Sequence, residues 1–203
     1  MKAREPREYR MSARADSAQL TRERIMDAML TRFAVTPYER IRLDDIAADA
    51  GVTVQTVIRR FGGKPALMTT VVERELGRIA GAREEAARSA QAPTPADTIA
   101  ALVQHYERYG DLILKTYSEA PLVEGLPELA ARGRDYHVDW CRRAFDAAID
   151  PAADGVLRRR RLAQIVAICD ATTWRILRAD GSLSPAETER ALLELLTPLL
   201  ARA

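Results

Sequence analysis

Apolar residues recur along this chain at intervals of three and four positions, the spacing that places side chains on one face of an α-helix. No stretch alternates apolar and polar residues as a half-buried strand does, and no Asn-Gly pair marks a hairpin. The pattern therefore predicts an all-α protein of about nine helices. Residues 1–17 are polar and mixed in charge, and they predict a loose arm before the first helix.

The first three predicted helices have clear start and stop signals. The first follows Thr21, ends near Pro37 and buries Ile25, Met26, Met29, Leu30 and Phe33. The second places Leu43, Ile46, Ala47 and Ala50 on one face. Gly51 suits a left-handed C-terminal position, and Thr53 suits the cap of a third helix that buries Val57 and Phe61. Two short helices joined in this way have the dimensions of a helix-turn-helix.

Longer helices are predicted downstream. Pro65 suits the first turn of a fourth helix that reaches about Arg88, and residues 89–95 predict a loop. Further helices are expected after Thr94, where Gly110 could interrupt the pattern, and near Pro127. Asp150 to Gly155 predicts a turn. One long helix is expected over about 156–179, and a capping box at residues 184–187 opens a last helix that holds the leucine-rich segment 192–200.

The outward face of the third helix carries the residue types that read DNA. Glutamine can bond adenine through two hydrogen bonds, and valine and threonine methyl groups can pack on a thymine methyl in the major groove. Gln55, Thr56 and Val54 offer these groups, and Ile58, Arg59 and Arg60 lie beside them. An ordinary helix with a solvated face has the same spacing, so the pattern alone leaves both interpretations open.

The amino-acid sequence of this region favours DNA binding over the alternative. The segment from Leu43 to Thr53 (LDDIAADAGVT), with Thr56-Val57 and the segment Phe61 to Leu67 (FGGKPAL), resembles the amino-terminal domain of the tetracycline-repressor (TetR) family. Residues 21–25 (TRERI) resemble that family's first helix. The resemblance covers about residues 21–68. It implies a DNA-binding domain over 1–68 and a ligand-binding and dimerisation domain over 69–203, in a homodimeric regulator that a small molecule usually releases from a palindromic operator.

The resemblance also implies roles for single residues. Gln55, Thr56 and Ile58 would touch bases, with Val54 beside them. Contacts to phosphates are implied for Thr53, Arg59, Arg60 and Lys64, and for Arg42 at the start of the second helix. The chain departs from the family at Ile58, where tyrosine is usual, and at Gly63, where serine or asparagine is common. Ile58 would then offer only an apolar contact.

The charge is uneven along the chain. Its net charge is only +2, but residues 1–64 hold 13 Lys or Arg and 9 Asp or Glu, whereas the remainder holds 18 and 20. A basic end on a near-neutral body suits contact with a polyanion, although a chance difference of a few charges is the alternative. Nearly all the basic residues are arginine and alanine is abundant, which indicates a bacterial source with a GC-rich genome.

Aromatic residues of the second half are candidates for an effector site. Large apolar side chains with isolated polar tips are typical of ligand pockets, and the candidates here are Tyr106, Tyr109, Tyr117, His137 and Trp140. They could equally pack a core. His137 and Cys141 lie one helical turn apart without a third metal ligand in register, so core packing is favoured over a metal site.

The remaining expectations concern chemistry, assembly and compartment. No acid–base set, phosphate loop or nucleophile elbow is found, so neither an enzyme nor a cofactor is expected. A helical-bundle enzyme and an interaction module that retains the helix-turn-helix are the alternatives. A homodimer is expected through the last two helices, where Ile165, Ile168, Cys169, Thr172, Ile176 and the segment 192–200 offer apolar surface. Two isolated cysteines and the absence of an apolar run of membrane length favour a soluble, cytoplasmic protein.

Overall fold

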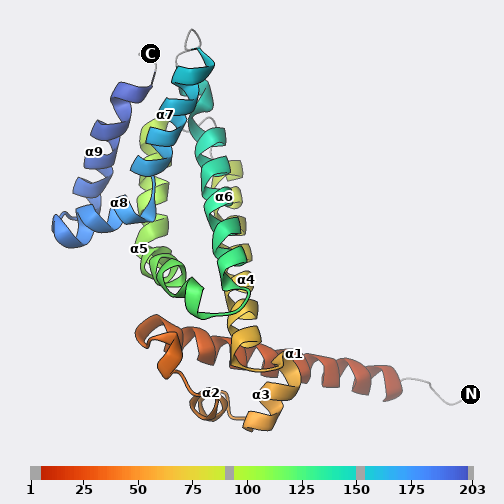
Figure 1. Cartoon of the computed structure of the whole chain (residues 1–203). Coiled ribbons are helices and arrows are strands. Elements are labelled where there is room, and N and C mark those ends of the chain that lie inside the picture. Colours follow the sequence, from red (N-terminus) through yellow and green to blue (C-terminus); the bar gives the residue numbers. More distant parts are fainter. Residues whose placement is uncertain (1–5, 90–93, 150–153, 201–203) are drawn as a thin grey trace, which may run out of the picture. The chain divides into compact units, whose positions relative to one another are not determined.

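The computed structural model describes residues 6–89, 94–149 and 154–200. Over these residues the chain forms nine α-helices and no strand, which confirms the all-α prediction (Figure 1). It divides into two compact units: unit 1 comprises Met1–Glu75 and Glu119–Pro127, and unit 2 comprises Leu76–Ser118 and Glu128–Ala203. The functional division near residue 68 stays a prediction. The connections predicted at 89–95 and 150–155 lie largely outside the described residues.

Unit 1 is built on the first helices of the chain. These are α1 (Pro6–Val35), α2 (Leu43–Asp49), α3 (Val54–Phe61) and the first part of α4 (Lys64–Ser89), with a 3-10 turn at Tyr38–Arg40 between α1 and α2. Its buried side chains come from all four helices and include Ile25, Met29, Phe33, Ile46, Val57, Phe61, Leu67 and Met68. The predicted periodicity of the first three helices is therefore confirmed, except that Leu30 is only half-buried.

The loose arm predicted over residues 1–17 is wrong from Pro6 onward, because α1 begins at Pro6 and runs unbroken into the first predicted helix. Residues 1–5 lie outside the described part of the chain. The segment lacks an apolar stripe, which is why the pattern gave no helix. Its arginine, glutamate, methionine and alanine residues nevertheless have high intrinsic helix propensity, and Pro6 is tolerated in a first turn. Propensity extends a helix whose later turns are fixed by packing.

Two arginine networks hold the helices of unit 1 in place. Arg32 of α1 donates to both carboxylate oxygens of Asp49 in α2, with N···O distances of 2.6 and 2.9 Å. Arg74 of α4 bonds Glu23 at 2.9 Å and Asp27 at 2.8 Å, both in α1. Hydrogen-bonded charge pairs of this kind fix orientation as well as adding energy. Helix α2 is thereby held against α1, and α1 against α4.

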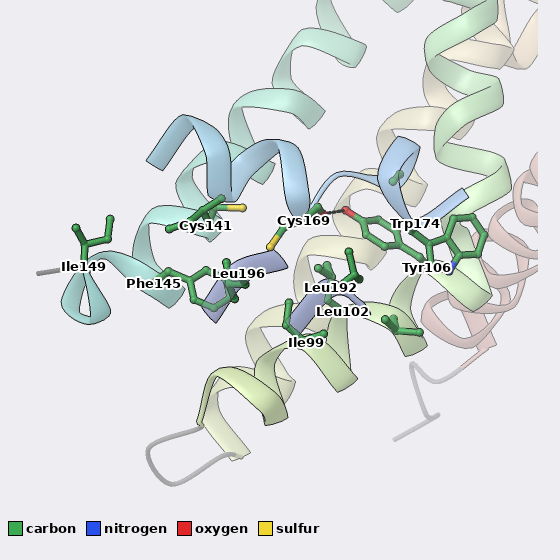
Figure 2. Packing of buried hydrophobic residues seen from close by; sticks show 13 residues of the cluster. Ile99, Leu102, Tyr106, Cys141, Phe145, Ile149, Cys169, Trp174, Leu192 and Leu196 are labelled. Carbon is green, nitrogen blue, oxygen red and sulfur yellow. Dashed lines mark hydrogen bonds between the residues drawn. The ribbon is translucent and has the colours of Figure 1, made fainter. Parts of the chain in front are cut away.

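Unit 2 has a core formed by five helices. They are α5 (Pro95–Glu119), α6 (Leu126–Phe145), α7 (Gly155–Ile168), α8 (Ala171–Arg175) and α9 (Pro185–Leu196). Figure 2 shows buried side chains converging from all five, and the largest include Ile99, Leu102, Tyr106, Phe145, Ile165, Trp174, Leu192 and Leu196. The capping box predicted at Ser184 is present, with Ser184 accepting from Glu187 N and the Glu187 carboxylate accepting from Ser184 N.

The single helix predicted over about 156–179 is wrong. Helix α7 ends at Ile168, α8 begins at Ala171, and a π-helical turn covers Ile176–Asp180. The Asp170 carboxylate accepts a hydrogen bond from Thr172 N at 2.8 Å and so caps α8. Short polar side chains compete for backbone donors in this way and start helices rather than continue them. The apolar period survives the break, which is why the sequence pattern did not show it.

Gly110 does not interrupt α5, which runs unbroken past it. A Cβ atom at Gly110 would lie 2.4 Å from Cζ3 of Trp174 in α8, well inside van der Waals contact. The glycine therefore permits the close approach of the indole. Trp174 in turn donates its indole N–H to Glu107, and Arg178 bonds the same carboxylate at 2.6 and 3.0 Å. This group fixes α8 and the following turn against α5.

No helix within the described ranges is both long enough and apolar enough to cross a membrane.

Candidate functional site

The turn between α2 and α3 fixes the geometry of the candidate DNA-reading helix. Gly51 adopts a left-handed φ of +64°, and Val52 N donates to Ala47 O at 2.9 Å to close the turn. The Thr53 side chain then accepts from Thr56 N at 3.2 Å and caps α3, as predicted. In Figure 1 this pair of short helices is the orange segment labelled α2 and α3. The predicted helix-turn-helix geometry over residues 43–61 is confirmed.

Helix α3 has one buried face and one open face. Val57 is completely buried and Phe61 is 8% exposed, so these two residues anchor the helix to unit 1. Gln55, Ile58 and Arg59 are exposed. Among the described residues, neither Gln55 nor Arg59 has a hydrogen-bond or ion-pair partner, so the amide and guanidinium groups are available. Ile58 is an exposed large apolar side chain, at 40%, in the middle of this polar face.

The other predicted contact residues at α3 are hydrogen-bonded or half-buried. The hydroxyls of Thr53 and Thr56 lie 2.9 Å apart and bond each other, and Val54 is half-buried. Arg60 donates from Nη1 to the carbonyl of Ala18 in α1 at 3.2 Å, while its Nε is buried without a partner in the described chain. The Arg60 side chain therefore already links α3 to α1.

Arg42 and Arg22 lie close to this helix pair. Arg42 precedes α2 and is exposed, with Asp44 at 3.8 Å, so its charge faces water. The Arg22 guanidinium carbon lies 4.9 Å from the centre of the Phe61 ring and covers the end of α3. The sequence pattern gave no signal for Arg22, because arginine on a helix is ordinarily a solvated residue.

Lys64 is engaged inside unit 1. Its ammonium donates to the carbonyls of Tyr38 at 3.1 Å and Ile41 at 3.0 Å, and it lies 4.3 Å from the centre of the Tyr38 ring. Burial lowers the pKa of Lys64, and the charge of Glu39 opposes that shift. The ammonium thus ties the N-terminus of α4 to the turn that precedes α2. The phosphate contact implied by the resemblance would require it to leave or share these acceptors.

In unit 2 the structure brings three of the five predicted effector residues together. Tyr106 is 3% exposed and donates its hydroxyl to Cys169 O at 2.8 Å (Figure 2). His137 contacts Val166 O through Nε2 at 3.2 Å, and its ring stacks on Trp140 with centroids 6.2 Å apart. Tyr106 and Trp140 in turn flank the guanidinium of Arg83 in α4, at 5.7 and 4.7 Å.

The other two candidates lie at the edge of this group, because His105 packs on both Tyr106 and Tyr109 and the charge of Arg83 acts to lower the pKa of Tyr117. Tyr109 packs beside His105 with ring centroids 5.2 Å apart. The Tyr117 hydroxyl would be 3.1 Å from a Cβ atom at Gly133, and Arg134 lies over its ring at 5.4 Å. The sequence gives no signal for Arg83 or His105 as members of this group. Helix α4 carries many charged residues that look alike in sequence, and only the packing distinguishes Arg83 from its neighbours.

The cysteines belong to the core of unit 2. Cys141 and Cys169 are both fully buried, and Figure 2 shows their sulfur atoms directed toward each other. A hydrogen bond from Cys169 lowers the pKa of Cys141 and raises that of Cys169. Cys141 Sγ also lies 3.7 Å from His137 Nε2. Within the described ranges, no three His, Cys, Asp or Glu side chains gather as a metal site would require.

Comparisons with known proteins give a consistent fold. The TetR-like transcriptional regulator LfrR from Mycobacterium smegmatis, solved with proflavine, is 24% identical with a TM-score of 0.58, over 91% of this chain and 99% of that one. The regulator FadR from Bacillus subtilis, solved with stearoyl-CoA, is 18% identical with a TM-score of 0.66, over 88% and 99%. A transcriptional regulator from Rhodococcus is 15% identical with a TM-score of 0.69, over 88% and 95%.

This chain has the fold of the TetR-like transcriptional regulators. The similarity extends over most of its length, so it includes both units and not only the helix-turn-helix. No family model and no curated protein sequence matches the chain. The likeness is thus one of structure, carried by the helix order and packing described above.

Proposed function

We propose that this protein is a DNA-binding transcriptional regulator of the TetR family. The observation that carries the proposal is the open face of α3, with Gln55 and Arg59 unpaired among the described residues and Ile58 exposed between them. A helix of this kind enters the major groove, where side chains near its N-terminus reach base edges. An overall fold shared with transcriptional regulators supports the same role.

The contacts divide into base and phosphate contacts. Gln55 bonds a base edge, Ile58 packs on an apolar base group such as a thymine methyl, and Thr56 and Val54 lie beside them. Arg59 and Arg42 face water and bind phosphates, with Thr53 and Arg60 at the edges of the same surface. Lys64 acts differently: it positions the helix pair through the Tyr38–Ile41 turn.

Regulation requires two copies and an effector. The predicted homodimer interface, on the last two long helices of the sequence prediction, falls on α7, α8 and α9 of the structure. Such a dimer would present two α3 helices about 34–36 Å apart, matching half-sites of a palindromic operator. Several residues of the predicted interface, including Ile165, Cys169 and Leu192, are buried within the chain itself. Among the described residues of this interface, Ile176 and Leu195 are large apolar side chains that are exposed, at 52% and 50%, and they are available for contact with a second copy. An effector bound in unit 2 would favour a spacing that does not fit the operator, so that a cytoplasmic repressor releases DNA.

An electrophoretic mobility shift on the promoter of the protein's own gene tests the proposal, with a scrambled duplex for comparison. Gln55→Ala should lower operator affinity by about 5- to 150-fold and leave scrambled DNA nearly unaffected, because a bidentate base contact contributes about 1–3 kcal/mol. Arg59→Ala should lower the affinity for both duplexes and flatten the slope of log K against log salt. Gln164→Ala, an exposed glutamine on α7, is the matched control. Equal binding of both duplexes by the unaltered protein would refute sequence-specific regulation.

A further inference from the structure

Arg83 lies in an unusual environment within unit 2. Its guanidinium carbon is 4.7 Å from the ring centre of Trp140, 5.7 Å from that of Tyr106 and 6.0 Å from that of Tyr136. The side chain is half-buried. None of the described carboxylates forms an ion pair with it. The guanidinium hydrogen-bonds the Tyr106 side chain and is otherwise surrounded by aromatic rings. A guanidinium has five N–H donors on a planar fork, so this partly buried cation retains unused donors.

Two imidazoles beside this cation also have unused polar atoms. His105 Nε2 and His137 Nδ1 are buried, and neither has a hydrogen-bond partner in the described chain. Native proteins rarely leave such atoms unsatisfied, so each indicates a missing partner such as a ligand or a water molecule. Burial and then the charges of Arg83 and His137 lower the pKa of His105 to about 3, so its imidazole is neutral at physiological pH. A neutral imidazole can still donate one N–H.

The charges around these groups favour an anion. The positive charge of Arg83 acts to lower the pKa of each titratable group around it: Tyr106, Tyr117, Tyr136, both histidines and both cysteines. Two carboxylates oppose this effect and act to raise the pKa of these tyrosines. Asp170 does so for Tyr106 and Tyr117, but its carboxylate already accepts a hydrogen bond from Thr172 N at the start of α8. Glu84 does so for Tyr136 alone among the three tyrosines. The guanidinium therefore lacks a bonded counter-charge from the described residues.

We infer that unit 2 binds a small organic monocarboxylate, whose carboxylate is held by Arg83 and whose apolar body lies against Trp140, Tyr106 and Tyr136. A single permanent cation matches a single negative charge, and a guanidinium fork fits a carboxylate through two parallel hydrogen bonds. The aromatic walls provide apolar contact for the rest of the molecule. The inference rests on the proposed function, because this molecule would be the effector that acts on DNA binding.

Direct binding without DNA tests the inference. Octanoate and 3-phenylpropionate are titrated into the full-length protein by calorimetry, each beside its uncharged primary amide. The carboxylates should bind at least about tenfold more tightly than the amides, because a charge-assisted bidentate contact is lost in the amide. Arg83→Met should remove that preference, and Arg83→Lys should restore part of it. Arg108→Met is the matched control, since Arg108 also lies over a tyrosine ring, at 5.1 Å, but is exposed.

Several outcomes would overturn the inference. They are equal affinity of the unaltered protein for acid and amide, absence of binding at millimolar concentration, tighter binding of octyl phosphate than of octanoate, or an unchanged preference in folded Arg83→Met. If Arg83→Met fails to fold, as circular dichroism would show, the acid–amide comparison and Arg83→Lys still decide the matter. DNA binding is measured separately, so intact operator binding with no carboxylate preference refutes the effector class alone. Carboxylate binding without operator binding refutes the proposed function.

Discussion

Lys64 offers a direct test of how the DNA-reading helices are positioned. Replacing Lys64 with methionine retains the aliphatic stem and removes the ammonium group. That group donates to Tyr38 O at 3.1 Å and Ile41 O at 3.0 Å, and it lies 4.3 Å from the Tyr38 ring centre. A third approach, to Glu39 O at 3.5 Å, is too long to add much.

The expected loss follows from these contacts. Hydrogen bonds from a charged donor contribute roughly 1.5–3 kcal/mol each, and a cation over an aromatic ring adds about 0.5–2 kcal/mol. Burial, which lowers the pKa of Lys64, shows that part of this gain is spent on desolvating the ammonium. We therefore expect Lys64→Met to lower the free energy of unfolding of unit 1 by about 2–4 kcal/mol. For a chain of this size that is a fall in Tm of roughly 5–15 °C.

Thermal unfolding followed by circular dichroism measures the loss, and operator titration at several salt concentrations measures the role in DNA binding. Arg42→Met is the matched control, because it removes an exposed charge whose nearest acid, Asp44, lies at 3.8 Å. It should change stability by less than about 0.5 kcal/mol. If Lys64→Met melts like the unaltered protein while the slope of log K against log salt flattens by about 1, the ammonium binds phosphate and the positioning role is refuted.

Three further predictions concern unit 2 and assembly. Gly110→Ala should lower stability by about 1–3 kcal/mol despite the better helix propensity of alanine, because the added Cβ would lie 2.4 Å from the Trp174 ring; unaltered urea unfolding would contradict this. Because His105 has its pKa lowered from 6.5 to about 3, the unfolded chain takes up a proton that the folded chain does not, so stability should be lost as pH falls below about 6.5. Urea unfolding at pH 7.5 and about pH 5 should show this loss, and His105→Gln should reduce it. Light scattering should give a dimer mass, which Leu195→Glu lowers toward a monomer and Val35→Glu, also an exposed apolar position, does not.

Much of unit 1 could be predicted from the sequence because its signals are local. Glycine at residue 51 permits a left-handed turn, threonine at residue 53 caps the next helix, and Val57 and Phe61 repeat at a helical interval. Each signal acts within a few residues, so it can be recognised in the sequence. The outward face of α3 follows from the same interval, since Gln55, Ile58 and Arg59 do not fall on the buried positions.

The sequence pattern failed where competing local effects decide the outcome. It placed a loose arm where intrinsic propensity continues α1 to Pro6, and it placed one long helix where Asp170 caps α8. In both cases apolar periodicity did not indicate where the helix begins or ends. Periodicity reports burial, whereas helix ends depend on which group satisfies each backbone donor and acceptor.

What the sequence alone determined, then, is the all-α class and a helix-turn-helix with an open face. Only the tertiary structure decided the partners of the charged side chains. In the sequence, nothing distinguishes Lys64 and Arg83 from other basic residues. In the structure, Lys64 donates to the carbonyls of a turn, whereas Arg83 lies among aromatic rings from α5 and α6. The physical reason is that the energy of a charge depends on its solvation and on neighbours distant in sequence. Those neighbours are brought together only when the helices pack.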